Sequence, residues 1–369
     1  MARIEPGHPI SHQMIGLDLM RGLAALLVFV GHVRKESFVE YGALTNGHGL
    51  HTALGWAITR IGHESVLIFF VLSGFLVGGQ MIRRTEAGRF SITSYAIDRS
   101  TRILLPLVPA CLLTAAITLF IIHEPISGRE VLLNMVGLNE ILTTTMKYNA
   151  PLWTLSYEIW FYILAGGVGF LLSTRRPSLA ALIVVMIGLA VFTVIEARFF
   201  LYWSLGALAI FFLNVPHRWW YGAAGLTITC VGILGYQLAL DSNAIKAGGF
   251  LTPGLAEFTI CAGVALLIPL MASPAMNALL SPLRAPIQHL SAISYSLYLF
   301  HYPINAAFGP YFPRAANLNW DSIGVFWMKI VVILIAVHIL YFLFERNTVP
   351  LRAFFNRRLS QPAQKLTAE

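Results

Sequence analysis

MIGLDLMRGLAALLVFVGHV, residues 14–33, decides the fold of this chain. The run is apolar and long enough to cross a bilayer as one helix, which takes about 20 residues. It follows a polar leader, residues 1–13, and lacks the small-residue cleavage site of a signal peptide, so we expect it to remain as a helix. Similar runs recur, and we predict an all-α, polytopic transmembrane helix bundle of about ten spans. The predicted spans are 14–33, 64–82, 101–122, 151–172, 178–195, 199–215, 219–240, 250–272, 290–311 and 323–345.

The composition excludes a water-soluble protein. Apolar residues make up 57% of the 369 residues, charged residues only 11%, and the mean hydropathy is +0.71. Soluble globular chains contain about 25% charged residues. The length is taken up by the spans, so we predict a single membrane domain, residues 14–346, followed by a basic cytoplasmic tail, residues 347–369.

Lysine and arginine are distributed unevenly between the two sets of connecting segments. The segments on the side of the N-terminus carry about twice as many of these residues as those on the opposite side. Because cytoplasmic loops collect positive charge, we predict that both termini are cytoplasmic. The net charge of +8 then reflects this asymmetry and contact with anionic lipids, since the sequence contains no motif for nucleic-acid recognition.

The first span contains three ionisable residues, Asp18, Arg21 and His32. A charge inside a membrane costs at least about 2.5–3.5 kcal/mol, so such a residue marks a functional site by default. Arg21 and His32 are eleven positions apart, which places them within about 20° of each other around the helix and roughly 16 Å apart along it. We therefore expect one functional face, with Arg21 toward the cytoplasm and His32 toward the outer end. The alternative is that Arg21 extends to the headgroups and His32 lies in interfacial water.

Arg99 and Arg102 are three positions apart at the cytoplasmic start of the third span. Side chains at this spacing point the same way on a helix, and two guanidinium groups can bind a phosphate together. The alternative is that they only anchor the helix on its positive side.

Three further spans contain polar residues that can line a site. Glu158 in the fourth span must face a partner or a water-filled cavity, or be protonated. Ser294 and His301 lie seven positions apart on one face of the ninth span, where such groups can also simply join helices. Glu345 and Arg346 close the tenth span, and an ion pair at the helix end would also explain them.

Several ionisable residues are assigned no function. Lys329 is close enough to the end of its span to reach the interface. His338 is alone in an apolar span and is expected to be a hydrogen-bonded core residue. The first outer loop contains histidines without a neighbouring carboxylate or thiolate, so no metal site is predicted there. These are His48, His51 and His63.

Six motifs in order give the chain a family resemblance. They are Leu17-Asp18 with Arg21-Gly22 and His32; FFVLSGFL at 69–76, which includes Ser73; Arg99-Ser-Thr-Arg102; WTLS at 153–156 with Glu158 and Phe161-Tyr162; SYSLYLFH at 294–301, which includes Tyr298 and His301; and Phe344-Glu345-Arg346. With these motifs the chain resembles the acyltransferase-3 family of membrane acyltransferases, from about Leu17 to Arg346. Two positions depart from the family pattern: Leu67 replaces a polar residue before the Phe-Phe pair, and Asn347 replaces a proline.

The resemblance implies an enzyme of the bacterial inner membrane. Its donor would be cytoplasmic acyl-coenzyme A, usually acetyl-coenzyme A, and it would hold no permanently bound cofactor and no metal. The acceptor would be a hydroxyl of a cell-surface or periplasmic carbohydrate, such as exopolysaccharide, lipopolysaccharide, glucan or a lipid-linked glycan. Proteins of polysaccharide biosynthesis would be its partners. A transporter of a small anionic or glycan-related solute is the alternative, although such proteins typically have repeated halves that this sequence lacks.

The resemblance also suggests roles for individual residues. Arg99 and Arg102 would bind the donor's phosphates, and Arg21 would extend this path inward. The catalytic residues would be Arg21 and His32, with His32 as the general base. A covalent acyl-histidine intermediate is an alternative route. Residues that would line or support the pocket are Asp18, Ser73, Glu158, Tyr298, His301 and Glu345.

Overall fold

The computed structural model describes residues 14–174, 178–216, 218–240 and 252–360, and within them the chain is helical. Two isolated bridges are the only β-type pairings among these residues. The all-α prediction is confirmed, whereas the leader 1–13, residues 250–251 of the eighth predicted span and residues 361–369 of the tail lie outside the described residues.

The α-helices are α1 (Ile15–Ser37), α2 (Leu50–Arg60), α3 (Gly62–Ser73), α4 (Gln80–Glu86), α5 (Ile92–Phe120), α6 (Gly128–Met135), α7 (Trp153–Ser173), α8 (Leu179–Val194), α9 (Arg198–Leu208), α10 (Arg218–Leu240), α12 (Pro253–Met271), α13 (Pro274–Leu279), α14 (Arg284–Ala307), α15 (Trp320–Leu343) and α16 (Thr348–Ser360). Shorter elements are η2 (Tyr41–Ala43), η3 (Gly74–Gly79), η4 (Lys147–Leu152), η5 (Ala209–Phe212), η6 (Ser281–Leu283) and η7 (Glu345–Asn347).

Seven helical segments in the described part of the chain are long and apolar enough to cross a membrane. Two further apolar helices, Leu179–Val194 and Arg198–Phe212, are shorter. α14 has 24 residues, which is long enough, but its sequence is more polar. The chain is therefore a multi-pass membrane protein, while the number of ten crossings and the cytoplasmic location of the termini stay predictions. The seven segments are Ile15–Ser37, Leu50–Glu86, Ile92–Phe120, Lys147–Ser173, Trp219–Leu240, Pro253–Met271 and Trp320–Arg358.

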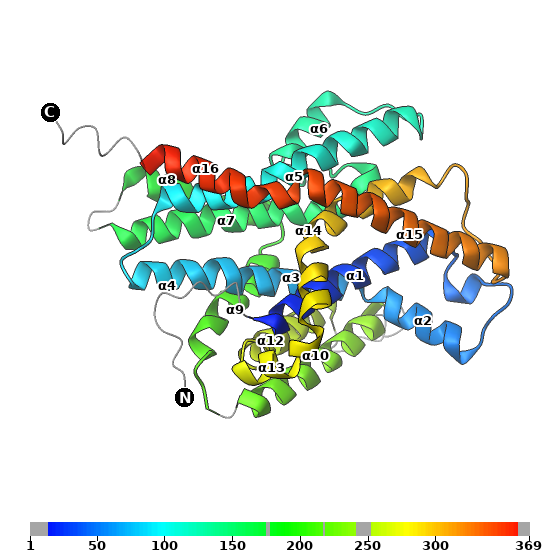
Figure 1. The fold of residues 1–369 in the computed structure, drawn as a ribbon, viewed down its shortest axis with the longest axis horizontal. Coiled ribbons are helices and arrows are strands. Elements are labelled where there is room, and N and C mark those ends of the chain that lie inside the picture. Colours follow the sequence, from blue (N-terminus) through cyan, green and yellow to red (C-terminus); the bar gives the residue numbers. More distant parts are fainter. Residues whose placement is uncertain (1–13, 175–177, 217, 241–251, 361–369) are drawn as a thin grey trace.

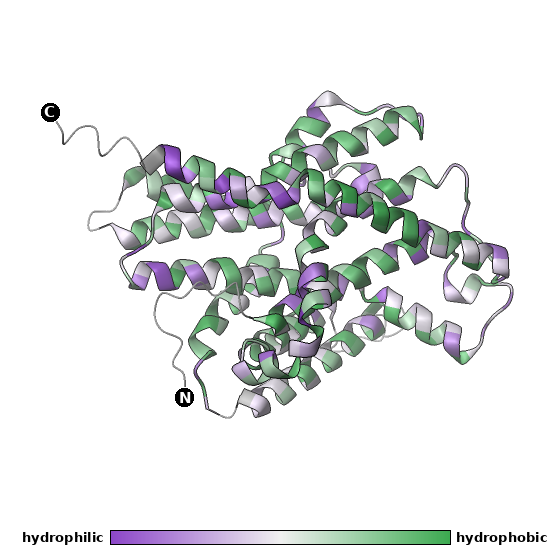
Figure 2. Cartoon of the chain, in the orientation of Figure 1, coloured by the Kyte–Doolittle hydropathy of each residue, from purple (hydrophilic) through white to green (hydrophobic). Residues whose placement is uncertain are grey.

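α1 lies in the middle of the bundle (Figure 1). It packs against α14, α3, α2 and α15, so its polar face meets other helices instead of lipid. α10 and α12 form a closely packed pair on one side, and α5 packs against α14, α7 and α16 on the other. Hydrophobic residues cover most of the helical surface, whereas hydrophilic residues gather on α4 and α16 (Figure 2).

Glycines allow α3 and its continuation η3 to cross α9 with almost no space between the backbones. A Cβ atom at Gly74 would collide with the carbonyl group of Trp203, and one at Gly206 would collide with that of Val71. Small residues permit this kind of contact in membrane helices. η3 is a π-helical turn, a form that is frequent at functional sites, and it directly follows Ser73 in the FFVLSGFL motif.

α5 begins nine residues before the predicted third span. Its N-cap is Ser91, whose hydroxyl oxygen accepts a hydrogen bond from the backbone N–H of Ser94 at 3.4 Å. Capping starts the helix among polar residues, where hydropathy gives no signal. Arg99 and Arg102 therefore lie within the helix rather than at its start, which corrects the predicted boundary at residue 101.

Two loops are joined at the C-terminal end of α1. The backbone N–H of Val39 donates to the carbonyl of Ala315 at 3.1 Å, and that of Ala315 donates to the carbonyl of Ser37 at 2.9 Å. Arg314 adds an ion pair with Glu36 at 2.9 Å. These contacts hold the end of α1 that carries His32 against the end of α14.

Candidate active site

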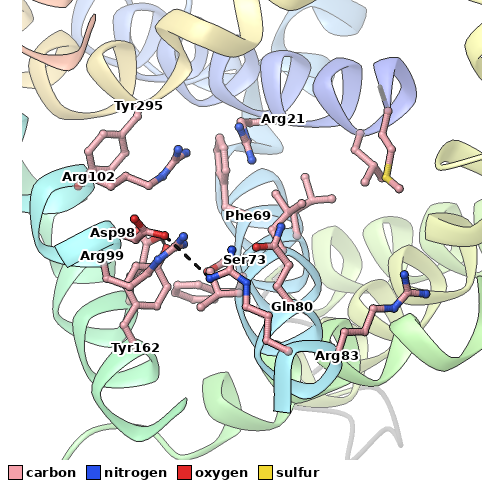
Figure 3. A pocket seen from close by; sticks show the side chains of 18 of the residues that line it. Arg21, Phe69, Ser73, Gln80, Arg83, Asp98, Arg99, Arg102, Tyr162 and Tyr295 are labelled. Carbon is pink, nitrogen blue, oxygen red and sulfur yellow. Dashed lines mark hydrogen bonds and ion pairs between the residues drawn. The ribbon is translucent and has the colours of Figure 1, made fainter. Parts of the chain in front are cut away.

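A cavity of about 1170 Å³ lies between α1, α3, α4, α5, α7, α14 and α16. Its lining is strongly cationic, because seven arginines face four carboxylates. Arg21 reaches into it from α1 and Arg102 from α5, and their guanidinium groups point into the same part of the cavity (Figure 3). The arginines are Arg21, Arg83, Arg84, Arg89, Arg99, Arg102 and Arg352, and the carboxylates are Asp18, Glu86, Asp98 and Glu158.

The two arginines of the Arg99-Ser-Thr-Arg102 motif both line this cavity, in different settings. The Arg99 guanidinium lies 5.5 Å from the ring centre of Tyr162 and 5.9 Å from that of Tyr95, which fixes its orientation. The Arg102 side chain is exposed to the cavity and forms no ion pair with a described carboxylate. Arg102 is therefore the more available of the two for an anionic ligand.

The predicted carboxylates have different positions. Asp18 accepts a hydrogen bond from the Ser291 hydroxyl at 2.8 Å, and Glu158 accepts one from Tyr162; both carboxylates line the cavity. Glu345 lies outside the lining, where one of its oxygens accepts from the backbone N–H and the hydroxyl of Ser296 at 2.9 and 2.6 Å. Glu345 thus joins η7 to α14 without lining the cavity. Its contacts are with Ser296 and not with Arg346, the partner that the sequence suggested.

Tyr298 lines the cavity at the end farthest from α4 and α16. Its hydroxyl donates to the carbonyl of Pro151 at 3.0 Å and lies 2.8 Å from the Thr154 hydroxyl. Phe69 packs on the same ring, with the centroids 5.8 Å apart. Ser73 also lines the cavity, and its hydroxyl oxygen accepts from the indole N–H of Trp203 at 3.4 Å.

His32 and His301 form a ring pair directly beyond Tyr298. Their ring centroids are 5.3 Å apart, and the centroids of Tyr298 and His301 are 6.3 Å apart. His301 is fully buried, and its Nδ1 lies 2.7 Å from the carbonyl of Leu297. Because a carbonyl can only accept, Nδ1 carries the proton and Nε2 is an acceptor without a partner among the described residues. His32 is half-buried and does not line the cavity, so the predicted path from Arg21 to His32 extends beyond the cavity lining.

The cavity contains residues that sequence reasoning assigned to topology alone. Asp98 lies between two arginines from other helices, 4.0 Å from Nη1 of Arg84 and 3.6 Å from Nε of Arg352. We call Arg84 and Arg352 the mouth arginines, because they hold α4 and α16 around Asp98 where the cavity lining reaches these helices. Their positions in polar connecting segments gave no signal that distinguished them from positive-inside anchors.

Two predictions about residues without a function are corrected. His63 has a carboxylate neighbour: its Nε2 is 2.8 Å from Glu257, which is 1% exposed and also contacts Arg198 at 3.2 Å and Tyr202 at 3.1 Å. His63 and Glu257 are 194 positions apart in the chain, so the sequence offered no link between them.

The second correction and one confirmed prediction concern α15. His338 is hydrogen-bonded, as predicted: its Nδ1 lies 2.8 Å from the carbonyl of Leu334, and its Nε2 lies 2.8 Å from Nε2 of His289. Lys329 does not extend to the interface: it is 1% exposed and its ammonium group donates to the backbone carbonyl of Glu36 at 3.4 Å. The Lys329 contact joins α15 to α1, and the His338 contact joins it to α14, the α-helix that precedes it in the chain.

Comparison with known families gives one match. A family model described as an acyltransferase domain matches residues 14–344, which is nearly the whole chain. No curated protein and no solved structure matches the chain.

Proposed function

The chain belongs to the acyltransferase-3 family, and on this premise we propose that it is an acyl-coenzyme A-dependent O-acyltransferase with a carbohydrate acceptor. The observation that carries the proposal is the arginine-lined cavity, whose far end lies beside the His32–His301 ring pair. A cationic chamber next to a potential base offers both a binding place for an anionic donor and a group for proton transfer.

The cavity suits the phosphates of coenzyme A. Guanidinium groups bind phosphate oxygens through charge-assisted, often bidentate hydrogen bonds. The guanidinium groups of Arg102 and Arg21 lie in the same part of the cavity and would contact the phosphates first, with Arg99 held in place by its tyrosines (Figure 3). The partly neutralised mouth arginines would add longer-range attraction as the donor enters.

The acyl group would travel along the face of α1. Arg21 and His32 are separated by roughly 16 Å along the helix, comparable to the length of the phosphopantetheine arm. Ser73 and Phe69 line this route, and Tyr298 marks the end of the cavity. We expect the thioester to pass Tyr298 and reach the ring pair when the donor is bound.

His32 would act as the general base. Its imidazole takes the proton of the acceptor hydroxyl as the hydroxyl oxygen attacks the thioester carbonyl carbon. The tetrahedral intermediate then breaks its C–S bond, and the departing thiolate takes the proton from the imidazolium. The products are the O-acyl ester and free coenzyme A, so atoms and charge balance without a metal. The acyl-histidine route has the same products and differs in the order of the steps.

His301 would be a positioning residue for His32. Its unprotonated Nε2 can accept a hydrogen bond from a ring N–H of His32, which would leave the other nitrogen of His32 as the base. The proposal further includes acetyl as the acyl group and the bacterial inner membrane as the location. A surface polysaccharide or lipid-linked glycan would be the acceptor, and glycan-biosynthesis proteins would be the partners.

A transfer assay with purified protein tests this function. Radiolabelled acetyl-coenzyme A is supplied to protein in detergent, and its binding is measured alongside transfer to glycan extracted from a deletion strain. Loss of surface-glycan acetylation in that strain, seen by mass spectrometry, would identify the acceptor. Solute flux in proteoliposomes without acetyl transfer would instead establish a transporter and overturn the proposal.

A further inference from the structure

A second hollow, of about 490 Å³, lies between η2 and the last turns of α2. We call it the 40–60 hollow. Two aromatic rings, a carboxylate and a guanidinium group stand in its lining together with small residues. The lining residues are Glu40, Tyr41, Gly42, Ala53, Trp56, Ala57 and Arg60.

The 40–60 hollow lies at the end of α1 that carries His32. Trp56 packs against Phe38, with the ring centroids 5.6 Å apart, and the Arg34 guanidinium lies 5.5 Å from the centre of its ring. Arg34 and Phe38 follow His32 by two and six positions, about 3 and 9 Å along the helix axis. The arginine-lined cavity instead reaches the other end of α1, at Met14 and Leu17. The two hollows therefore lie toward opposite ends of one helix. Arg34 and Phe38 are about 200° and 240° around the helix from His32, so the 40–60 hollow lies on the other side of α1 from the His32 ring, which contacts His301 and Tyr302.

The electrostatics of this hollow differ from those of the cavity. One carboxylate, Glu40, faces one guanidinium, Arg60, so the lining has no excess positive charge for a phosphate. The Glu40 side chain is 65% exposed, although it also meets Arg34 at 3.5 Å, and Arg60 forms no ion pair with a residue in the described ranges. An uncharged ligand that both donates and accepts hydrogen bonds fits this pair better than an anion does.

Two buried donors beside the hollow have no partner. The indole N–H of Trp56 and Nε of Arg34 make no hydrogen bond with described residues, although Trp56 is 8% and Arg34 5% exposed. Buried donors are almost always hydrogen-bonded, so each unpartnered one needs an explanation. A ligand hydroxyl that accepts a hydrogen bond from the Trp56 N–H would explain the donor of Trp56. The Tyr41 ring, whose centroid is 6.3 Å from that of Trp56 and whose plane is at 61° to it, can pack against the C–H face of a sugar.

We propose that the 40–60 hollow binds a pyranose unit of an uncharged glycan and so holds the acceptor at the His32 end of α1. This inference rests on the proposed acyl transfer and adds to it the class of acceptor and the residues that select it. Glu40 and Arg60 bind sugar hydroxyls, Trp56 donates its N–H, and the Tyr41 ring packs on one face of the sugar while the Trp56 ring, at 61° to it, meets the edge of the sugar. A unit farther along the same glycan then passes around the end of α1 and presents its hydroxyl to His32.

Saturation-transfer NMR on the detergent-purified protein tests the inference, with four tetrasaccharides as probes: maltotetraose, cellotetraose, laminaritetraose and mannotetraose. We expect the wild type to bind at least one of them. Tyr41→Ala and Arg60→Ala should each weaken that binding roughly fivefold or more, since each removes a ring contact or a hydrogen-bonding charge. Trp56→Ala should weaken it further, and its folding is checked by acetyl-coenzyme A binding. The matched control is Tyr311→Ala, a tyrosine that is 69% exposed outside the hollow.

The outcomes separate this inference from the proposed function. If the wild type binds no probe, or if Tyr41→Ala and Arg60→Ala bind as the wild type does, the 40–60 hollow is not the acceptor site. In that case donor binding and acetyl transfer by the wild type still support the enzyme. If the wild type neither binds acetyl-coenzyme A nor transfers acetyl groups, the proposed function fails, and this inference fails with it.

Discussion

Replacing Arg102 by alanine removes the guanidinium group that is most available in the cavity. Arg102 forms no ion pair with a described carboxylate, whereas Arg99 is held against two tyrosine rings. One hydrogen bond to a charged group contributes about 1.5–3 kcal/mol, and each 1.4 kcal/mol changes an equilibrium constant about tenfold. Since the cavity admits water, we expect the lower part of this range, a loss of roughly ten- to thirtyfold in acetyl-coenzyme A affinity. Arg102→Lys keeps the positive charge but loses the planar guanidinium group. Its affinity for acetyl-coenzyme A should therefore lie between those of the wild type and Arg102→Ala.

Equilibrium binding of radiolabelled acetyl-coenzyme A to the purified protein measures this effect. The matched control is Arg129→Ala, which removes an exposed arginine from α6, outside the cavity lining. The affinity of the wild type should also fall more steeply with salt than that of Arg102→Ala. If Arg102→Ala binds the donor as tightly as Arg129→Ala does, Arg102 only anchors its helix, and the cavity is not the donor site.

Four further predictions concern other parts of the molecule. His32→Gln should lower acetyl transfer by about 10²–10⁴-fold with donor binding intact, and substantial turnover would exclude His32 as the base. Asp98→Asn should free the mouth arginines and tighten donor binding about two- to fivefold at low salt; unchanged or weaker binding would contradict this. Glu257→Gln should lower stability by about 1–3 kcal/mol in detergent unfolding, because it removes the negative charge and leaves one acceptor oxygen for the three side chains that contact this carboxylate; an unchanged midpoint would show that the network is dispensable. In a cysteine-free background, Thr93→Cys and Thr45→Cys should be labelled from opposite sides, and labelling from one side would refute the donor path.

Hydropathy predicted the class of fold because long apolar runs have few alternatives to a membrane helix. The first span shows how far this reasoning goes. The run at 14–33 became α1, and the periodicity of Arg21 and His32 placed them on one helix face that meets the rest of the bundle. Helix starts were less predictable. α5 begins at a serine cap among polar residues, which a search for apolar runs passes over.

Contacts between distant segments could not be predicted from a single sequence. His63 looked isolated because Glu257 is on α12, and nothing in the sequence singled out Asp98, which lies between arginines of α4 and α16. In each case the partner is fixed by how helices pack, which residue spacing along one segment does not encode. Arg99 and Arg102 were found because both members lie on one helix turn, where spacing determines direction.

The position of His32 follows from a physical difference between the two proposed substrates. A donor with several phosphates cannot enter apolar surroundings without matching positive charge, and this charge is supplied by arginines at one end of α1. An uncharged glycan needs aromatic surface and paired hydrogen-bonding groups, which the 40–60 hollow supplies at the other end. A base located among the arginines would meet the phosphates instead of the acceptor hydroxyl. Placing the imidazole eleven residues farther along the same helix face allows the uncharged acyl arm, and not the charged nucleotide, to cross the apolar interior to the acceptor.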